Sequence, residues 1–353
     1  MRHAVLPLRG AQNSATHGGA QLSKRRTRVA TINDVARAAG VSRSTVSRVL
    51  NGQISSPEAR AKVEKAIAET GYRANAHARS LASGKSNVYA AILTEPYGEL
   101  FEDPTFGRML QGINSALVGG DIALNLLFAT TDEERERTLR QLAPNRVDGA
   151  LVLSPHINDP VLNDMSTEIP TIVLGPLVEG RENTWTVTID DRQGGELGAR
   201  HLRERGARRI AIIAGPDTAQ GAHDRVEGQL SGLGTAPLEI IHAPYSTGGG
   251  TSATRELLAK HPDLDGILCG SDRQALGALA VLREAGRSIP GDVKVVGFDD
   301  HAFAAETTPA LTTIAQPIFD VGASGARLLN ALGERQPLQS LTLPTTLVVR
   351  ETT

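Results

Sequence analysis

The hydrophobic positions between residues 31 and 71 lie three or four residues apart, which is the spacing of amphipathic helices. Three short helices are predicted, with these apolar faces: Ile32, Val35, Ala36 and Ala39; Val46, Val49 and Leu50; and Val63, Ala66 and Ile67. Residues that cap or end helices stand at the boundaries, namely Thr31, Gly40, Ser42, Ser56 and Gly71. Two short helices around a glycine turn form a helix-turn-helix, which lays its second helix in the major groove of DNA.

The second predicted helix carries polar residues that could read DNA. We expect Arg43, Ser44 and Arg48 to contact base edges, because arginine pairs bidentately with guanine and serine can contact bases. Backbone positioning is expected from other polar residues, Ser42, Thr45 and Ser47, with Thr31 and Asn51 as further DNA contacts at the ends of the motif. Any short, exposed helix rich in arginine and serine has the same pattern, so the alternative of a plain surface helix stays open.

Beyond residue 87 the chain alternates between strand-like and helix-like segments. Most strand candidates are continuous apolar runs, as in parallel strands that are buried on both faces: 88–94, 122–128, 150–153, 171–175, 209–214, 238–242, 266–270 and 293–298. Amphipathic helices are predicted between them, such as 106–118, 191–205, 272–284 and 318–332. This alternation predicts parallel sheets with crossover helices, and there are enough strands for two sheets and hence two lobes.

The charge is divided between the two parts of the chain. Residues 1–86 hold 15 Lys and Arg against four Asp and Glu, whereas the rest holds 22 basic and 35 acidic residues. A basic head on an acidic body is typical of nucleic-acid binding, although Lys24, Arg25, Arg26 and Arg28 could equally form a solvated basic tail. We predict a disordered tail over 1–29, a helix-turn-helix domain over 30–74, a hinge and linker over 75–86, and a ligand-binding and dimerisation domain over 87–353.

Several classes of protein are disfavoured by composition. No apolar run approaches ~18 residues, so no membrane span is expected. Residues 1–30 lack the apolar core of a signal peptide, and Cys269 is the only cysteine, which excludes an internal disulfide and a cysteine-rich zinc site. The glycines at 248–250 have neither a Walker lysine nor a dinucleotide fingerprint beside them. We expect a cytoplasmic protein, bound to the nucleoid when on DNA, that uses no metal or cofactor and catalyses no reaction.

Polar residues follow several of the predicted strands. Asp299 follows 293–298, Ser271 and Asp272 follow 266–270, and the loop 215–225 follows 209–214. In doubly wound sheets, ligands bind at the carboxyl ends of strands, so these residues are candidates for a binding site. Such residues also cap helices, and a cap is the favoured role for Asp272.

Residues 31–86 resemble the lac repressor (LacI/GalR) family of transcriptional regulators. The resemblance rests on TINDVARAAGVSRSTVSRVLN, SSPEARAKVEKAIAETGYRAN and ARSLASGKS, and weaker matches continue along the chain. It implies a hinge helix that wedges Leu81 into the minor groove, with Asn75 and Ala78 beside it. It also implies a two-lobed, periplasmic-binding-protein-like domain. We expect the chain to cross between the lobes near Asp190, at 311–316 and near Thr345.

The resemblance also implies residues for a ligand between the lobes. Asp299 matches an effector-binding aspartate, Gln316 a residue of the crossover, Phe106 a loop aromatic, and Tyr245 lies near an aromatic position. The chain departs from the family at two positions, where His223 replaces an arginine and Ser271 replaces an asparagine, while Arg225 matches the next arginine of the motif. The family implies a homodimeric repressor of double-stranded operator DNA with a small polar effector, a sugar or oligosaccharide.

Two other classes of protein share parts of this pattern. A solute-binding protein of the periplasm would have the same body, but the helix-turn-helix and the missing signal peptide argue against it. An α/β enzyme acting on sugars, with an accessory basic head, would need a nucleophile–base pair or a metal cluster, and the sequence displays neither. The pattern is compatible with an effector that acts as an inducer and with one that acts as a corepressor.

Overall fold

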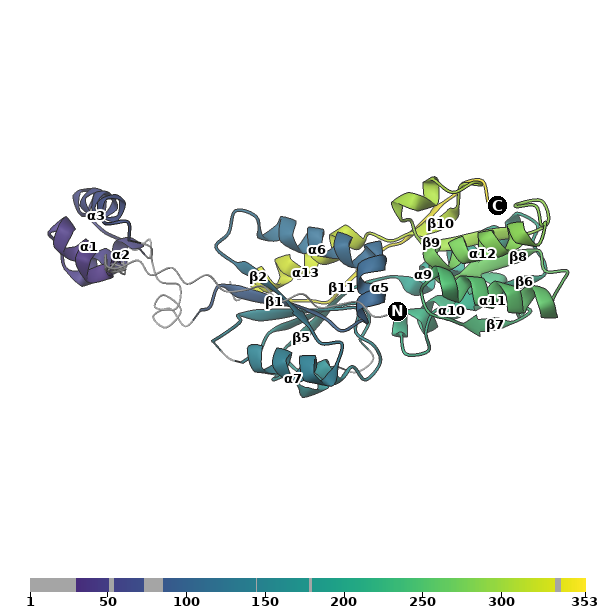
Figure 1. Ribbon diagram of the computed structural model, residues 1–353, viewed down its shortest axis with the longest axis horizontal. Helices are drawn as coiled ribbons and strands as arrows, with labels where there is room; N and C mark the ends of the chain where they lie inside the picture. The colour runs from purple at the N-terminus through teal and green to yellow at the C-terminus, as the bar shows by residue number, and fades with distance from the viewer. Residues whose placement is uncertain (1–29, 51–53, 73–84, 144, 178–179, 334–337) are drawn as a thin grey trace, which may run out of the picture. The chain divides into compact units, whose positions relative to one another are not determined.

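The computed structural model describes residues 30–50, 54–72, 85–143, 145–177, 180–333 and 338–353. The chain divides into two compact units, Met1–Asn75 and Ala76–Thr353, called here the head and the body (Figure 1). The predicted tail over 1–29 and the residues Asn51, Asn75, Ala78 and Leu81 lie outside the described part of the chain. Within the described residues, no helix is long and apolar enough to cross a membrane.

The head contains the three predicted helices, α1 (Ile32–Ala39), α2 (Arg43–Leu50) and α3 (Pro57–Thr70). Thr31 begins α1 with a capping box shared with Asp34, and Gly40 ends it in the left-handed conformation that favours glycine. The predicted apolar faces meet in one core built around Val35, Val46 and Val63. The helix-turn-helix expected from the periodicity is therefore confirmed.

The body contains two six-stranded sheets, each forming one lobe. Lobe 1 has the strand order β11-β5-β4-β3-β1-β2. Its strands are β1 (Val88–Leu93), β2 (Ala123–Phe128), β3 (Gly149–Leu153), β4 (Thr171–Leu174), β5 (Thr184–Ile189) and β11 (Leu341–Leu343). Its helices are α5 (Tyr97–Glu102), α6 (Pro104–Leu117), α7 (Asp132–Gln141), α8 (Pro160–Asp164) and α13 (Ile318–Gly333), with α6 and α13 on the sheet face opposite α7 (Figure 1).

Lobe 2 has the strand order β12-β10-β9-β8-β6-β7. Its strands are β6 (Ile210–Ala214), β7 (Ile240–His242), β8 (Gly266–Cys269), β9 (Lys294–Asp299), β10 (Thr312–Ala315) and β12 (Thr346–Val348). Its helices are α9 (Asp191–Glu204), α10 (Gln220–Leu233), α11 (Thr247–Lys260) and α12 (Asp272–Glu284), followed by a short 3-10 helix, Ala302–Ala305. Among the described residues, the strand pairs of both sheets are parallel except β10 with β12, which is antiparallel.

The central strands are buried on both faces, as their apolar runs predicted. Consecutive residues of β1 alternate between two cores, with Tyr89, Ala91 and Leu93 on one side of the sheet and Ala90 and Ile92 on the other. Strand β6 does the same in lobe 2. Helices must therefore cover both faces of each sheet.

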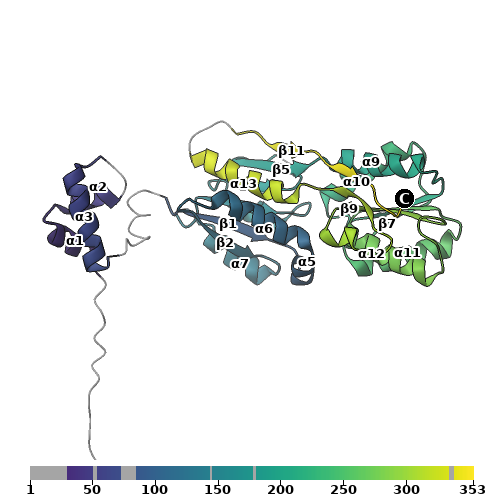
Figure 2. The ribbon, with the colours of Figure 1, turned by 90° about the horizontal axis from the view of Figure 1, so that it is seen from above.

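The chain crosses between the lobes three times, from β5 to α9, from β10 to α13 and from β11 to β12. These crossings lie at the predicted places, near Asp190, at 311–316 and near Thr345. Figure 2 shows the C-terminal segments, in yellow, passing between the lobes. Because the two sheets are joined only by such segments, the carboxyl ends of strands from both sheets surround the region between the lobes.

Candidate functional site

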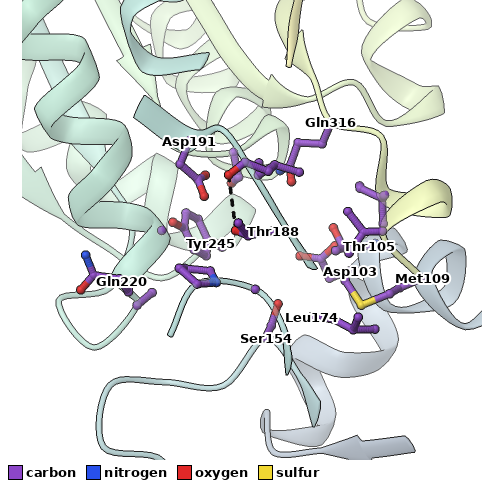
Figure 3. A pocket seen from close by; sticks show the side chains of 18 of the residues that line it. Asp103, Thr105, Met109, Ser154, Leu174, Thr188, Asp191, Gln220, Tyr245 and Gln316 are labelled. Carbon is purple, nitrogen blue, oxygen red and sulfur yellow. Dashed lines mark hydrogen bonds between the residues drawn. The ribbon is translucent and has the colours of Figure 1, made fainter. Parts of the chain in front are cut away.

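A cavity of about 200 Å³ lies between the two lobes. Side chains from both lobes point into it, with Asp103, Ser154 and Leu174 from lobe 1 and Asp191 and Tyr245 from lobe 2 (Figure 3). Its wall is polar at the strand ends and apolar toward α6 and α13, where it includes Phe106, Met109, Ile318 and Val321. An apolar pocket with a few convergent polar groups is the usual form of a small-molecule site.

Asp299, at the end of β9, is the most constrained acid of the cavity wall. Its φ of 123° lies in a region that residues other than glycine rarely adopt. Gln316, just after β10, donates its amide to Asp299 Oδ1, and the Asp272 backbone N–H donates to Oδ2 over 3.4 Å. The Asp299 side chain is only 7% exposed, yet it lines the cavity. A buried carboxylate held in this way can accept hydrogen bonds from a ligand.

Burial raises the pKa of Asp299 to about 6, although the positive charges of His301 and Arg225 oppose the shift. The Nε2 atom of His301 lies 3.4 Å from Asp299 Oδ2 and 3.5 Å from Asp103 Oδ1. Burial alone would lower the pKa of His301, but its hydrogen bond to Asp103 and the charge of Asp299 raise it overall. The Asp299 oxygens accept from Gln316 and the Asp272 N–H, so the carboxyl group presents hydrogen-bond acceptors at the cavity wall.

Arg225 of α10 forms a second buried charge cluster. Its Nε donates to Asp191 Oδ1 over 2.6 Å, and Nη1 donates to the Gly270 carbonyl. The guanidinium lies 3.9 Å above the Phe298 ring centroid and 5.4 Å from that of Tyr245. Burial raises the pKa of Asp191 even though Arg225 opposes it. The cation is thus bound by protein groups on several sides.

The structure brings most of the predicted ligand residues together. Six of them line the one cavity: Phe106, Arg225, Tyr245, Ser271, Asp299 and Gln316. His223 does not; its Nε2 lies 2.7 Å from the Asp217 carbonyl, outside the cavity wall. His223 and Arg225 are two residues apart on α10, which turns their side chains about 200° from each other. Arg225 faces the cavity, so His223 must face away.

The expected capping role of Asp272 is wrong. Ser271 caps α12 by accepting from the Gln274 N–H over 3.1 Å. Asp272 instead accepts from the Thr313 hydroxyl at 2.6 Å and from the His301 N–H at 2.9 Å. Asp272 is fully buried, and burial and the charge of Asp299 raise its pKa. Its two hydrogen bonds tie β10 and the segment after β9 to α12.

Several lining residues escaped the sequence analysis, and His156 is the most informative of them. Its Nε2 lies 2.7 Å from Glu95 Oε1, and its Nδ1 lies 2.7 Å from the Thr218 hydroxyl of lobe 2. The hydrogen bond to Glu95 raises the pKa of His156. Asp103, Thr188 and Asp191 were missed too. Asp103 caps α6, Thr188 lies in β5 and Asp191 begins α9, and only the tertiary structure shows that they converge.

The predicted DNA-reading residues are displayed on the head. Arg43, Ser44 and Arg48 are exposed on α2, whereas Thr45 and Ser47 are half-buried. The Ser42 hydroxyl accepts from the Thr45 N–H over 3.1 Å, so it caps α2, and it also lies 2.7 Å from the Ser44 hydroxyl. The exposed arginines therefore stand on a helix whose start is fixed by its own hydroxyls.

A helix-turn-helix head and a two-lobed body with a cavity between the lobes define a ligand-controlled, DNA-binding regulator of transcription. Two family models match the chain: "Bacterial regulatory proteins, lacI family" over residues 31–75 and "Periplasmic binding protein-like domain" over 199–353. The transcriptional regulator CelR of Thermobifida fusca is 38% identical over 337 residues, covering 92% of this chain and 99% of that protein. The ribose operon repressor of Halalkalibacterium halodurans is 34% identical, covering 92% and 97%.

Solved structures of transcriptional regulators are similar to this chain over most of its length. A complex of the transcriptional regulator CelR with cellobiose is 36% identical, with a TM-score of 0.72 and coverage of 92% of this chain and 100% of that one. A lac repressor dimer bound to operator and an anti-inducer is 27% identical, with a TM-score of 0.80 and coverage of 92% and 99%. The chain therefore belongs to the LacI family of bacterial transcriptional regulators.

Proposed function

We propose that this regulator is a repressor whose hold on its operator is controlled by a neutral sugar bound between the lobes. The observation that carries the proposal is the Asp299 carboxyl group, which is buried and held by Gln316 at the cavity wall. A carboxylate in this setting accepts paired hydrogen bonds from adjacent hydroxyls, and such charge-assisted bonds are the strong ones. Apolar contacts from Phe106 and Met109 would complement the faces of a sugar ring.

The charge of the cavity wall favours an uncharged ligand. Five carboxylates line it, Glu95, Glu99, Asp103, Asp191 and Asp299, against a single guanidinium and one imidazole among the described lining residues. Those two cations are already paired, Arg225 with Asp191 and His156 with Glu95. A phosphate or carboxylate on the ligand would enter a negative field with no free cation to bind it. We infer that phosphorylated and acidic sugars are rejected.

Relatives support a sugar and suggest which to test first. The CelR structure holds cellobiose, and another family member of known structure, 29% identical, holds ribose. Isothermal titration calorimetry should therefore compare cellobiose, ribose and glucose with cellobiose 6-phosphate. We expect a neutral sugar to bind and to be recovered unchanged by chromatography, and its phosphate to bind at least about tenfold more weakly. Tighter binding of the phosphate would contradict the proposal.

Asp299→Asn is the direct test of the site. It keeps the size of the side chain but removes the charge, and loss of hydrogen bonds to a charged group costs about 1.5–3 kcal/mol of binding free energy. Asp263→Asn is the matched control, because Asp263 lies in the same lobe, is paired with Arg209 and does not line the cavity. Wild-type sugar affinity in Asp299→Asn would refute the assigned role.

For DNA recognition we infer a homodimer that binds a pseudo-palindromic operator in the bacterial cytoplasm. Arg43, Ser44 and Arg48 would read bases, while Ser42, Thr45 and Ser47 would bind the phosphate backbone. Support comes from their display on α2 and from the operator-bound dimer of the lac repressor. Band-shift titration with selected operator fragments, with and without the sugar, would show whether the sugar releases the protein or promotes binding.

A further inference from the structure

Arg273, the second residue of α12, extends from lobe 2 to a group of acids on lobe 1. Its Nη1 lies 2.7 Å from Glu99 Oε2 and 3.7 Å from Asp103 Oδ2, and its Nη2 lies 3.1 Å from Glu102 Oε2. Nη1 also donates to the Tyr245 carbonyl over 2.9 Å. The Arg273 side chain is only 6% exposed. One buried guanidinium is thus surrounded by three carboxylates from the other lobe.

The three acids lie where α5 ends and α6 begins, called here the α5–α6 corner. Glu99 and Asp103 line the cavity, whereas Glu102 and Arg273 do not. Arg273 therefore touches two residues of the cavity wall from behind, and its bond to the Tyr245 carbonyl supports a third. Any effect of Arg273 on a ligand must act through the position and charge of these residues.

We propose that Arg273 is a positioning residue that holds the α5–α6 corner against lobe 2 and thereby sets the affinity for the effector. The identity of that effector rests on the function proposed above, but the clamp itself does not. Arginine suits the task because its planar fork can bind several carboxylates at once and stays charged. Its charge also balances Glu99 and Asp103, which would otherwise repel each other at the cavity wall.

The clamp favours the arrangement in which the lobes approach each other. Moving the lobes apart would separate the buried Arg273 guanidinium from all three carboxylates together. A ligand bound by both lobes selects the closed arrangement, so its apparent affinity falls when that arrangement is less populated. Other polar contacts between the lobes, among the described residues, include His301 with Asp103 and Thr105, and His156 and Ile157 with Thr218.

The test compares Arg273→Gln and Arg273→Lys with Arg255→Gln by calorimetry, using cellobiose as the probe. Arg255 is the matched control because it forms an exposed pair with Glu284 within lobe 2. We expect Arg273→Gln to raise the Kd about tenfold or more, Arg273→Lys to raise it less, and Arg255→Gln to leave it unchanged. Equal Kd values for Arg273→Gln and the wild type would overturn the proposal.

Substitution of Glu102 distinguishes a positioning role of Arg273 from direct contact with the ligand, because Glu102 is 72% exposed and does not line the cavity. Glu102→Gln should raise the Kd a few-fold in the wild-type background and have no effect when combined with Arg273→Gln. Equal effects of Glu102→Gln in both backgrounds would show that Glu102 and Arg273 are not coupled, and would overturn the clamp.

A measurement without ligand keeps the clamp testable if cellobiose does not bind. Spin labels at Glu133→Cys on α7 and Ser252→Cys on α11 occupy exposed positions of the two lobes, while the native Cys269 is buried. Pulsed dipolar spectroscopy should show a longer or broader distance distribution in Arg273→Gln than in the wild type and Arg255→Gln. Identical distributions would overturn the clamp, whereas absent cellobiose binding alongside a changed distribution would count only against the sugar.

Discussion

Asp299 combines an uncommon backbone conformation with a buried charge. Its φ is 123°, and that of the next residue, Asp300, is 56°. Strained backbone of this kind costs of order 1–3 kcal/mol for each residue and is found most often at functional sites. The side chain is almost fully buried beside Asp103 and Asp272. This residue therefore lowers the stability of the ligand-free body while it prepares the cavity for a ligand.

Asp299→Asn should increase the stability of the ligand-free protein. Burial raises the pKa of the carboxyl from its ordinary value of 3.8 to about 6, so the ionised form is less favourable in the folded than in the unfolded chain. The wild type should therefore lose stability as the pH rises from about 4 to about 6. Asparagine carries no charge and should add about 1–3 kcal/mol to the free energy of unfolding at pH 7.

Urea denaturation of the wild type, Asp299→Asn and Asp263→Asn at several pH values checks this. The advantage of Asp299→Asn should be largest at pH 7 and shrink toward pH 4, where the wild-type carboxyl is protonated. An advantage that is independent of pH would mean that charge burial is not its cause.

For single residues, the position along a strand predicts membership of the binding site better than the residue type does. Asp299 could be placed in the site because it follows a buried apolar strand, and the end of such a strand faces the ligand region. His223 matches a ligand-contact position of the family, with a surface histidine at the helix start as the alternative, and it lies off the cavity wall because α10 turns it away from the side that carries Arg225. Asp191 could not be found, since its partner Arg225 is 34 residues away and only the packing of α9 on α10 joins them.

At the scale of elements, three helix pairs pack through glycines. A Cβ at Gly228 of α10 would lie 1.9 Å from the Arg192 carbonyl of α9. The backbones of α6 and α13 approach each other as closely at Gly112 and Gly322, and those of α11 and α12 do so at Gly250 and Gly277. Backbones that approach this closely leave no space for a methyl group, so the glycines set the distance between the helices.

Gly228→Ala should therefore lower both stability and sugar affinity. The added methyl group must push α10 away from α9, and overpacking of this kind costs about 1–3 kcal/mol of stability. The shift would also separate Arg225 from Asp191, because Arg225 precedes Gly228 by one helical turn. Gly248→Ala is the control, since its Cβ would meet only the Ser246 hydroxyl at 3.9 Å. Thermal unfolding should show lower stability, and calorimetry lower sugar affinity, for Gly228→Ala, whereas Gly248→Ala should match the wild type in both.

The recognition helix α2 gives a second test at this scale. Arg48→Ala should cost about 1–3 kcal/mol of binding free energy on the specific operator and less on random DNA, because arginine pairs bidentately with guanine. Fluorescence anisotropy with both DNAs at one salt concentration measures the two losses. Equal losses of binding free energy on the two DNAs would indicate that Arg48 contacts phosphate and not bases.

Helices and strands with a regular spacing of apolar residues could be predicted from the sequence, whereas short or solvent-facing strands could not. The helices of the head were predictable because caps and apolar spacing agree at each boundary. Strand β5 has no continuous apolar run to mark it, because Thr184, Thr186 and Thr188 alternate with Trp185, Val187 and Ile189. Strand β11 is three residues long and pairs with β5 from a distant part of the chain, so no local signal marks it.

At the scale of the whole molecule, regulation requires communication between the head and the body. The family resemblance assigns this role to a hinge over 75–86, with Leu81 as a wedge in the minor groove. Leu81→Ala should weaken operator binding and reduce DNA bending, because an apolar wedge stabilises the kinked step. Sugar affinity should stay the same. A circular-permutation band-shift assay measures the bend, and an unchanged bend would exclude the wedge.

The three crossings also determine when the body can fold during synthesis. Lobe 1 needs α13 and β11, which come after nearly all of lobe 2 in the chain, and lobe 2 needs β12, which comes later still. The head, in contrast, is continuous and can fold as soon as it leaves the ribosome. A message cut short before residue 318 would therefore yield a DNA-reading head attached to two unfinished lobes. Such a fragment would keep the helix-turn-helix but lack the part of the cavity wall that α13 supplies, which includes Ile318 and Val321.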